Sequence, residues 1–326
     1  MTPAHTAPPT PVIDAHCDTL HYLLQDKGSL GEGIPDAHLD IPRLRAGGVS
    51  AQVFACWVPS PYHRYEATAF ALRLVETFHR QAERYPDQMV VMRNAADIEI
   101  AAASGRVAGI LALEGAEPLV GHLETLGAFY RLGLRWLGLT WNHRNEVADG
   151  LDAARTGGGL TPFGVDVVHA CADMGIVVDV SHLAPAGVED VLKEARGPVV
   201  ASHSNARTLC DHERNLSDDQ ARGIAATGGV IGVTFVPGFL TDTPEEATLD
   251  HILDHIAFFA DLVGVEHVGI GSDFDGLGKR QPPRGLEDAS CYGSIRTGLE
   301  ARGFTAQAIA AIMGGNWLRV LRQVCG

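Results

Sequence analysis

Histidine and carboxylate side chains follow an apolar run near the start of this sequence. The run Val12–Ala15 has the length of a short strand and leads into His16 and Asp18. Residues two apart on a strand point to the same face, so these two side chains would project together. An imidazole and a carboxylate make half of a metal site. Taken alone, the pair is better explained as two solvated polar residues at a strand end.

The same arrangement recurs after other apolar runs. Glu114 follows the run 107–113, His182 the run 176–180, His203 the run 198–201 and Asp273 the run 267–270. Recurrence at the same end of separate strands favours a metal site over chance. Imidazole and carboxylate ligands suit zinc and related divalent ions. With His16 and Asp18 the set exceeds what one tetrahedral ion with an open position needs, but it suffices for two ions that share a bridging carboxylate.

Two metal ions at such a site could do hydrolytic chemistry. A pair of ions about 3.5–4 Å apart can hold a hydroxide and stabilise the oxyanion of a hydrolytic transition state. Asp273 is left over from the ligand set. A carboxylate beside the hydroxide could take its proton and later pass it to the leaving group.

Eight apolar runs of strand length alternate with longer stretches of mostly helical character. The runs cover residues 12–15, 49–58, 107–113, 135–140, 176–180, 198–201, 230–236 and 267–270. Strands that are apolar on both faces are typical of a parallel sheet covered by helices. Eight such units predict an α/β fold, a (β/α)8 TIM barrel with its site at the carboxyl ends of the strands. An open doubly wound sheet is the alternative, although no GxGxxG follows the first run.

The composition limits the classes of partner and compartment. The 326 residues carry 40 acidic and 25 basic side chains, a net charge of −15, which argues against nucleic acid and anionic membranes. No apolar run approaches the roughly 20 residues that span a bilayer, and the first residues lack the features of a signal peptide. Six scattered cysteines predict no disulfide framework. We expect a cytoplasmic protein with a disordered tail over residues 1–11 and a single domain over residues 12–326.

Taken together, the motifs resemble the membrane (renal) dipeptidase family, peptidase family M19, among the amidohydrolase-type metal barrels. The resemblance covers nearly the whole chain and depends on the order and spacing of motifs that are each weak alone. It implies a bacterial soluble member of the family. The motifs are Val12–Asp18, Leu113–Gly115, Val178–His182, Pro198–Ser204, Arg214-Asn215, Gly271–Gly276 and Gly314–Val320.

The resemblance implies a role for each candidate ligand. His16 and Asp18 would hold one Zn2+ ion, and His182 and His203 would hold the second. Glu114 would bridge the two ions, where many related barrels use a carboxylated lysine.

Two further residues gain roles from the resemblance. Asp273 would be the residue that transfers the proton. Arg214 matches an arginine that grips the terminal carboxylate of the substrate, a task that suits its bidentate fork. Without the resemblance, a surface ion pair of Arg214 with Asp211, Glu213 or Asp218 would be the preferred interpretation.

The chain departs from the family pattern after the fourth predicted strand. The renal form has a histidine directly after a Leu-Thr pair, where it contacts the substrate carbonyl or oxyanion. Here Trp141 occupies that position, and His143 follows two residues later. A bulged loop would bring His143 to the substrate as a catalytic and substrate-binding residue. If His143 points away, Asn142 or metal coordination must polarise the carbonyl.

Three aspartates near the ligands have less defined roles. Asp14 and Asp179 are either acceptors for the ligand imidazoles or interior residues that bond to backbone groups. Asp275 is predicted to be a turn residue because Gly276 follows it directly.

The predicted function is a zinc-dependent dipeptidase in which a metal-bridging hydroxide attacks the peptide bond of a small dipeptide substrate. Acceptance of a D-residue at the C-terminal position, and a homodimeric state, are left open. An amidohydrolase for N-acyl amino acids or lactams on the same barrel is the alternative. A metal-binding protein without catalysis is a third hypothesis, which the complete ligand set and Asp273 argue against.

Overall fold

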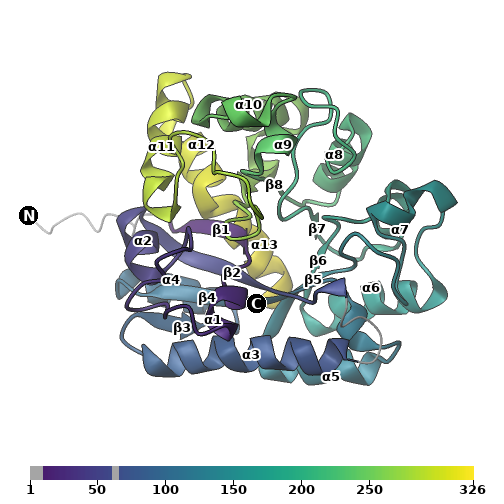
Figure 1. The fold of residues 1–326 in the computed structure, drawn as a ribbon. Helices are drawn as coiled ribbons and strands as arrows, with labels where there is room; N and C mark the ends of the chain where they lie inside the picture. The colour runs from purple at the N-terminus through teal and green to yellow at the C-terminus, as the bar shows by residue number, and fades with distance from the viewer. Residues whose placement is uncertain (1–9, 61–65) are drawn as a thin grey trace, which may run out of the picture.

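Parallel strands close into a barrel in the computed structural model, which describes residues 10–60 and 66–326 (Figure 1). The strands are hydrogen-bonded in the order β7-β6-β5-β4-β2-β1-β9-β8, and every pairing is parallel. Ala201, just after β7, pairs with Ile231 of β8 and joins the two ends of this order. The strands are β1 Val12–Cys17, β2 Val49–Trp57, β3 Met89–Val91, β4 Val107–Glu114, β5 Leu134–Gly138, β6 Val177–Asp179, β7 Val199–Val200, β8 Ile231–Val233 and β9 Val268–Ile270.

The predicted (β/α)8 barrel is confirmed, and each of the eight predicted runs overlaps one barrel strand. The additional strand β3 lies off the barrel order and pairs with the start of β4, where Met89 faces Val107. Further along β4, from Leu111, β5 takes the place beside it. Three residues are too few to show a periodic pattern, which explains why the sequence did not indicate β3.

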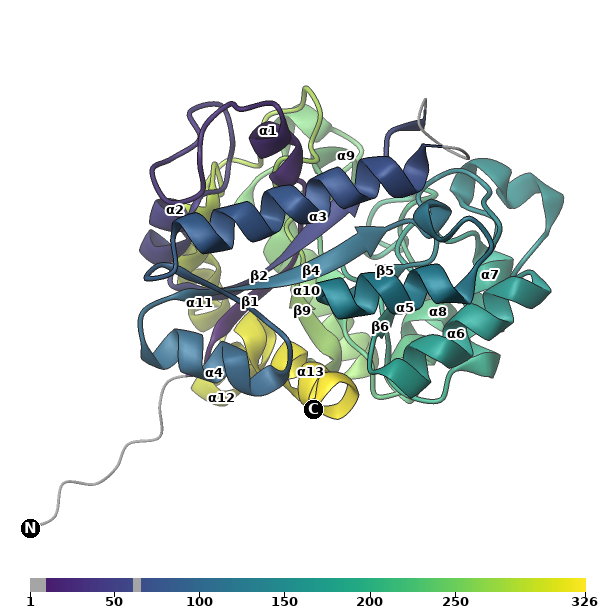
Figure 2. The ribbon, with the colours of Figure 1, turned by 90° about the horizontal axis from the view of Figure 1, so that it is seen from below.

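Helices surround the barrel. In Figure 2, α4, α12 and α13 lie at one end of the strands, and α1 and α9 lie at the other. The predicted cap residues Thr161 and Ser217 begin α6 and α8, and Ser217 forms a capping box with Gln220. The helices are α1 Leu20–Leu24, α2 Ile41–Ala46, α3 Ala67–Arg84, α4 Ala95–Ala103, α5 Leu123–Leu132, α6 Pro162–Met174, α7 Pro185–Glu194, α8 Asp218–Ala226, α9 Pro237–Leu240, α10 Leu249–Val263, α11 Tyr292–Ala301, α12 Ala306–Ala310 and α13 Asn316–Cys325.

The helix α13 packs against the barrel through a buried tryptophan. Trp317 is fully buried, contacts the ring of Trp136 at 5.3 Å and donates its indole N–H to the Ile270 carbonyl at 3.0 Å. A Cβ at position 269 would lie 2.4 Å from the Trp317 Nε1 atom, so only glycine permits this approach. The two indoles therefore pack in a part of the barrel that holds none of the predicted ligands, which lie at the carboxyl ends of the strands.

Two buried aspartates tie neighbouring strands together beneath the ligands. Asp14 accepts hydrogen bonds from the backbone and hydroxyl of Ser272 and from the Tyr292 hydroxyl, at 2.7–2.8 Å. Asp179 accepts from the Trp136 indole and from the backbone N–H groups of Ser181 and Ser202, each at 3.0 Å. Neither carboxylate accepts from a ligand imidazole in the described structure. The interpretation as interior residues bonded to backbone groups therefore holds.

Two predictions on chain organisation stay predictions. The tail expected over residues 1–11 falls mainly on residues 1–9, outside the described residues, and the single domain over residues 12–326 is not tested. None of the helices in the described ranges is long and apolar enough to cross a membrane. A cytoplasmic location and a homodimer are not tested either.

Candidate metal centre

The predicted ligands and Asp273 meet at the carboxyl end of the barrel. His16 is the centre of this cluster. Its Nε2 atom lies 3.5 Å from Glu114 Oε2, 3.8 Å from Asp273 Oδ1 and 3.9 Å from Asp18 Oδ2. Strand β1 has a register irregularity between Asp14 and Cys17, a bulge of the kind that re-aims side chains next to functional sites.

The two oxygens of Glu114 face different histidines. Oε2 faces His16, whereas Oε1 lies 3.0 Å from His182 Nε2 and 3.7 Å from His203 Nε2. Glu114 is the last residue of β4 and only 7% exposed. A carboxylate so placed can bind one cation with each oxygen.

His182 and His203 are oriented by neutral side chains. Their Nε2 atoms lie 2.9 Å apart. The Nδ1 atom of His182 lies 2.7 Å from Asn142 Oδ1, and the Nδ1 atom of His203 lies 2.7 Å from the Ser202 hydroxyl. Partners at Nδ1 fix the ring orientation and direct Nε2 toward the cluster, as they do for metal-binding histidines.

Backbone strain is concentrated at this cluster. His182, Asp273 and Asp275 have φ values of 70°, 62° and 69°, although none is glycine. Left-handed conformations are uncommon for residues other than glycine, although aspartate and histidine adopt them more readily than most, and they persist where the surrounding structure enforces them. Asp275 is held by the His38 backbone N–H at 2.6 Å and the Thr19 hydroxyl at 2.5 Å, so it anchors a turn, as predicted.

The electrostatics of His16 and Glu114 are coupled. Burial opposes the charged form of His16, but the negative charges of Glu114, Asp18 and Asp273 raise the pKa of its imidazole to about 10. Burial alone would raise the pKa of Glu114, but the positive charge of His16 and contacts with His16 and His182 hold it well below its usual range. Glu114 is therefore ionised, and a cation that binds His16 must displace a proton.

The other two imidazoles are neutral. Burial, followed by the charge of Arg214, lowers the pKa of His182 to about 4. Burial, followed by the charge of His16, holds the pKa of His203 well below its usual range. Neutral imidazole is the form that binds metals. Burial also raises the pKa of Asp273 to about 6, with Glu114 adding to the shift and His16 opposing it.

The donor set fits divalent cations. His16 Nε2 and Asp18 Oδ1 are buried and have no hydrogen-bond partner in the described residues. The ligand atoms of His16, Glu114 and His203 lie within 4.8 Å of one another, and so do those of His16, Asp18 and Asp273. Buried polar atoms without partners are costly, and a metal ion in this space would satisfy them.

Arg214 is buried behind the cluster. It is 5% exposed and donates to the Ser204 hydroxyl and the His203 carbonyl, each at 3.0 Å. No carboxylate in the described residues lies within 4.0 Å of its guanidinium, so a surface ion pair is excluded there. Burial lowers its pKa to about 10, which leaves the side chain charged at neutral pH. A buried, unpaired guanidinium is suited to an anionic ligand.

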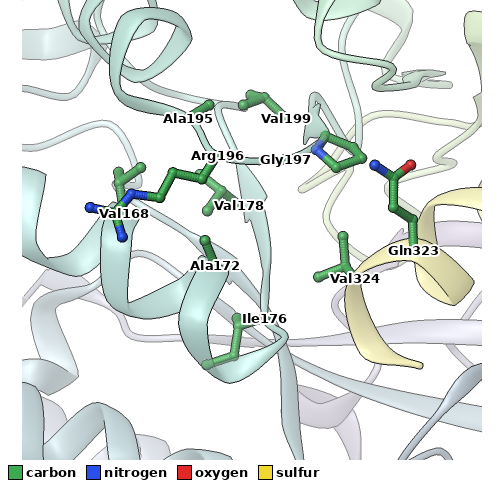
Figure 3. Close-up of a pocket in the computed structure, with 11 residues that line it drawn as sticks. Val168, Ala172, Ile176, Val178, Ala195, Arg196, Gly197, Val199, Gln323 and Val324 are labelled. Carbon is green, nitrogen blue, oxygen red and sulfur yellow. The ribbon is translucent and has the colours of Figure 1, made fainter.

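A cavity of about 580 Å³ opens onto the cluster. Its lining includes Asp18, Glu114, His182 and Asp273 of the cluster and the Asn142 amide, together with aromatic and basic side chains: Trp57, Trp141, His212, Phe239 and Arg280. Figure 3 shows a smaller cavity of about 130 Å³ elsewhere, between α6, the segment before β7 and the end of α13. Its lining is mainly aliphatic and holds none of the cluster residues. The larger cavity is the candidate substrate site.

His143 does not line that cavity, whereas its neighbours Trp141 and Asn142 do. Its Nε2 atom lies 2.9 Å from the Ser60 hydroxyl, and its Nδ1 atom lies 2.9 Å from Asp152 Oδ2. The side chain is 40% exposed. The structure thus brings the other predicted site residues together and places His143 outside them; its predicted role in catalysis is not tested.

Two side chains that orient the ligands were not predicted in that role. The sequence indicates no role for Ser202, and it indicates Asn142 only as a substitute for His143. Asn142 orients His182 through a loop that returns over the barrel, and Ser202 precedes His203 by one residue. The adjacency of Ser202 and His203 was a usable signal. The contact between Asn142 and His182 has no such signal, because the two residues are forty positions apart in the sequence.

Imidazoles and carboxylates gathered at the carboxyl ends of a closed parallel barrel define a barrel metallohydrolase. The chain belongs to the membrane dipeptidase family, peptidase family M19, whose model matches residues 6–325. It is therefore a metallo-dipeptidase of that family, as the motifs indicated.

Relatives come from fungi and bacteria. The chain is 34% identical to an uncharacterized dipeptidase of Schizosaccharomyces pombe, over 95% of this chain and 80% of that protein. It is 33% identical to dipeptidase aclJ of Aspergillus oryzae, over 88% of this chain and 70% of that protein. The expected bacterial origin of this chain stays a prediction.

Solved structures agree with the fold. A metallopeptidase of Rhodobacter sphaeroides, solved with a phosphinate mimic of the dipeptide L-Ala-D-Ala, superposes with a TM-score of 0.91 at 30% identity, covering 97% of this chain and 99% of that one. A family M19 metallopeptidase described as dipeptidase AC superposes with a TM-score of 0.90 at 32% identity, with the same coverage.

Proposed function

We propose that this chain is a binuclear zinc dipeptidase that hydrolyses dipeptides with a free C-terminal carboxylate. The observation that carries the proposal is Glu114, whose Oε2 faces His16 while its Oε1 faces His182 and His203. A buried carboxylate divided in this way suits a bridge between two cations. His16, Asp18 and Glu114 would hold one ion, and His182, His203 and Glu114 the other. Bound together, the two ions would supply an activated water and stabilise the developing oxyanion.

Asp273 is the proposed proton carrier. Its Oδ1 atom lies 3.8 Å from His16 Nε2, at the wall of the substrate cavity. From there the carboxylate accepts a proton from the attacking water and donates it to the nitrogen of the leaving amine. The backbone of Asp273 has a φ of 62°, a conformation that persists where the surrounding structure enforces it.

Arg214 is the proposed receptor for the terminal carboxylate. Its guanidinium is buried and lacks a carboxylate partner in the described residues, and Ser204 and the His203 carbonyl hold it in place. The fixed Arg214 guanidinium, close to His203, restricts the length of substrate that can place its scissile bond at the metal centre. This supports a preference for dipeptides over longer peptides.

We further propose that the C-terminal residue of the substrate can have either configuration. The support is the L-Ala-D-Ala mimic in the Rhodobacter sphaeroides structure, which shares 30% of its sequence with this chain. The enzyme loaded with zinc should hydrolyse both L-Ala-L-Ala and L-Ala-D-Ala.

A screen of the zinc-loaded protein tests the function. We expect two zinc ions per chain by elemental analysis, and hydrolysis of dipeptides. The amidated dipeptide L-Ala-L-Ala-NH2 should have at least a hundredfold lower kcat/KM, because it lacks the carboxylate partner of the buried Arg214 charge. N-acetyl amino acids keep that carboxylate but lack the amino group of a dipeptide, so they test the alternative function separately. Equal or better hydrolysis of N-acyl amino acids would instead support the alternative amidohydrolase.

A further inference from the structure

A second arginine stands at the edge of the substrate cavity, apart from the metal-binding groups. Arg280 lines the cavity of about 580 Å³ and also a neighbouring cavity of about 400 Å³. Its side chain is exposed, and it pairs with no carboxylate among residues 10–60 and 66–326. Surface arginines in an acidic protein, with 40 acidic side chains here, usually have such partners available.

The segment that carries Arg280 is held at its base. Asp275 is anchored by His38 and Thr19, and Leu277 is fully buried. The backbone N–H of Arg280 donates to the Leu277 carbonyl at 3.3 Å, which closes a turn through Gly278 at φ 67°. This turn positions Arg280 at the cavity edge and leaves its guanidinium available to a ligand.

Arg280 lines the cavity together with Phe239 and His212, whereas the buried Arg214 lies behind this lining, beside Phe239. The Arg214 guanidinium lies 5.9 Å from the centroid of the Phe239 ring, and the His212 ring centroid lies 4.5 Å from that of Phe239. Burial is the main cause that lowers the pKa of His212, and the charges of Arg214 and Arg280 both add to it. His212 and Arg280 both line the cavity, so both can contact the same part of a bound substrate.

The rest of the cavity lining has a different character. Trp57 and Trp141 pack against each other at 5.1 Å, and His21 packs on Trp57 at 5.2 Å. Arg280 is the only lysine or arginine among the described residues that line the cavity. The aromatic side suits an uncharged side chain, whereas the side of Phe239 suits negative charge.

We propose that Arg280 binds an acidic side chain on the C-terminal residue of the substrate, so that the enzyme favours dipeptides ending in Asp or Glu. The inference rests on the proposed function, because Arg214 must hold the α-carboxylate of the same residue. The two carboxylates of that residue then meet two arginines, Arg214 buried beside Phe239 and Arg280 exposed at the cavity edge. The exposed pair is partly screened by water, so its effect is modest.

Matched substrates and variants test the proposal. Wild-type enzyme should show a kcat/KM for L-Ala-L-Glu about fivefold above that for L-Ala-L-Gln, the size expected of one screened ion pair. R280Q should bring this ratio to about one, mainly through KM, and R280E should invert it. R284Q is the control, since Arg284 lines only the neighbouring cavity and the ratio should stay unchanged. The ratio of L-Glu-L-Ala to L-Gln-L-Ala should not respond to R280Q.

The outcomes separate this inference from the proposed function. If L-Ala-L-Ala is hydrolysed but wild type does not prefer Glu over Gln, or R280Q keeps the preference, the role of Arg280 is refuted and the dipeptidase stands. If the zinc-loaded protein hydrolyses no dipeptide, the proposed function fails, and the inference fails with it. A preference that declines as NaCl is raised would support an ion pair at the exposed edge.

Discussion

The Nε2 atoms of His182 and His203 lie 2.9 Å apart in the wall of the metal centre. Both imidazoles are neutral, because burial lowers the pKa of each. The Asn142 amide oxygen accepts the Nδ1 proton of His182, which leaves a lone pair on Nε2. This lone pair can accept an N–H from His203 or bind a cation placed between the two rings. Glu114 Oε1 lies 3.0 Å from His182 Nε2 and 3.7 Å from His203 Nε2, so the proposed cation would have three ligand atoms at this position.

The bridging role of Glu114 predicts that Glu114→Gln loses metal. An amide cannot supply a charged oxygen to both histidine groups, so zinc affinity should fall by at least about a hundredfold, beyond the 10–100-fold typical when an orienting residue is removed. Elemental analysis after dialysis should find fewer than two ions per chain. Glu117→Gln is the matched control: burial raises the pKa of Glu117 to about 7, and that variant should keep its zinc. Full zinc occupancy in the Glu114 variant would contradict the bridge.

Proton transfer by Asp273 predicts a separate result. Asp273→Asn keeps the size of the side chain and an oxygen beside His16, so zinc content should stay near that of the wild type. Turnover should fall by about 10²–10⁴, the range for loss of a general acid or base. The measurement is kcat for L-Ala-L-Ala alongside zinc content. Activity within tenfold of wild type at full zinc loading would remove Asp273 from the proton path.

The sequence predicts the parts of the site that follow from local patterns, and it does not predict the parts that depend on contacts between residues far apart in the chain. His16, Glu114 and Asp273 were predictable because each ends or follows an apolar strand, and parallel strands bring such ends together. The short strand β3 and the orientation of His143 were not predictable, because three residues show no period and loop geometry depends on remote partners. Ser60 and Asp152, far apart in sequence, decide where His143 lies.

The same limit applies to the interior of the barrel. The run around Asp14 indicated a strand, but its partners Ser272 and Tyr292 are 258 and 278 residues away. Arg214 illustrates the reverse case. Its nearest acidic neighbours in sequence suggested an ion pair, yet the fold buries the guanidinium against Ser204, and Asp218 pairs with Arg222 instead. Local charge patterns do not show which side chains the fold turns inward.

His255 predicts how stability responds to acid. It is buried, accepts the Ala206 backbone N–H at 3.1 Å and bonds the Leu240 carbonyl at 3.1 Å. Burial lowers its pKa to about 4, so between pH 6.5 and 4 the unfolded chain binds a proton that the folded chain excludes. Its contribution is complete above pH 6.5 and is lost as pH falls toward 4, on the order of 3 kcal/mol in all.

Urea unfolding at several pH values measures this contribution. The difference in the free energy of unfolding between wild type and His255→Gln should shrink as the pH is lowered from 7 to 4.5. The reason is that only wild type has the buried imidazole, which binds a proton in the unfolded chain and not in the folded one. Replacement of the exposed His122 by Gln serves as the control for loss of a surface imidazole and should change the free energy of unfolding little. A His255 difference that is constant across this range would contradict the titration.

Gly276 predicts a steric limit on the metal centre. A Cβ at this position would lie 2.2 Å from Asp18 Oδ2 and 2.2 Å from Asp273 Oδ1, closer than atoms can approach. Gly276→Ala must therefore displace two carboxylates of the cluster, and we expect loss of zinc and at least a hundredfold lower kcat/KM, as misplacement by about 1 Å can cause. Gly278→Ala is the matched control, because a Cβ there meets nothing within 4 Å although its φ of +67° adds strain. That variant should lose about 1 kcal/mol of stability and keep activity toward L-Ala-L-Ala within about threefold. Equal losses of activity in both variants would show that backbone strain, rather than contact with Asp18 and Asp273, requires glycine in this turn.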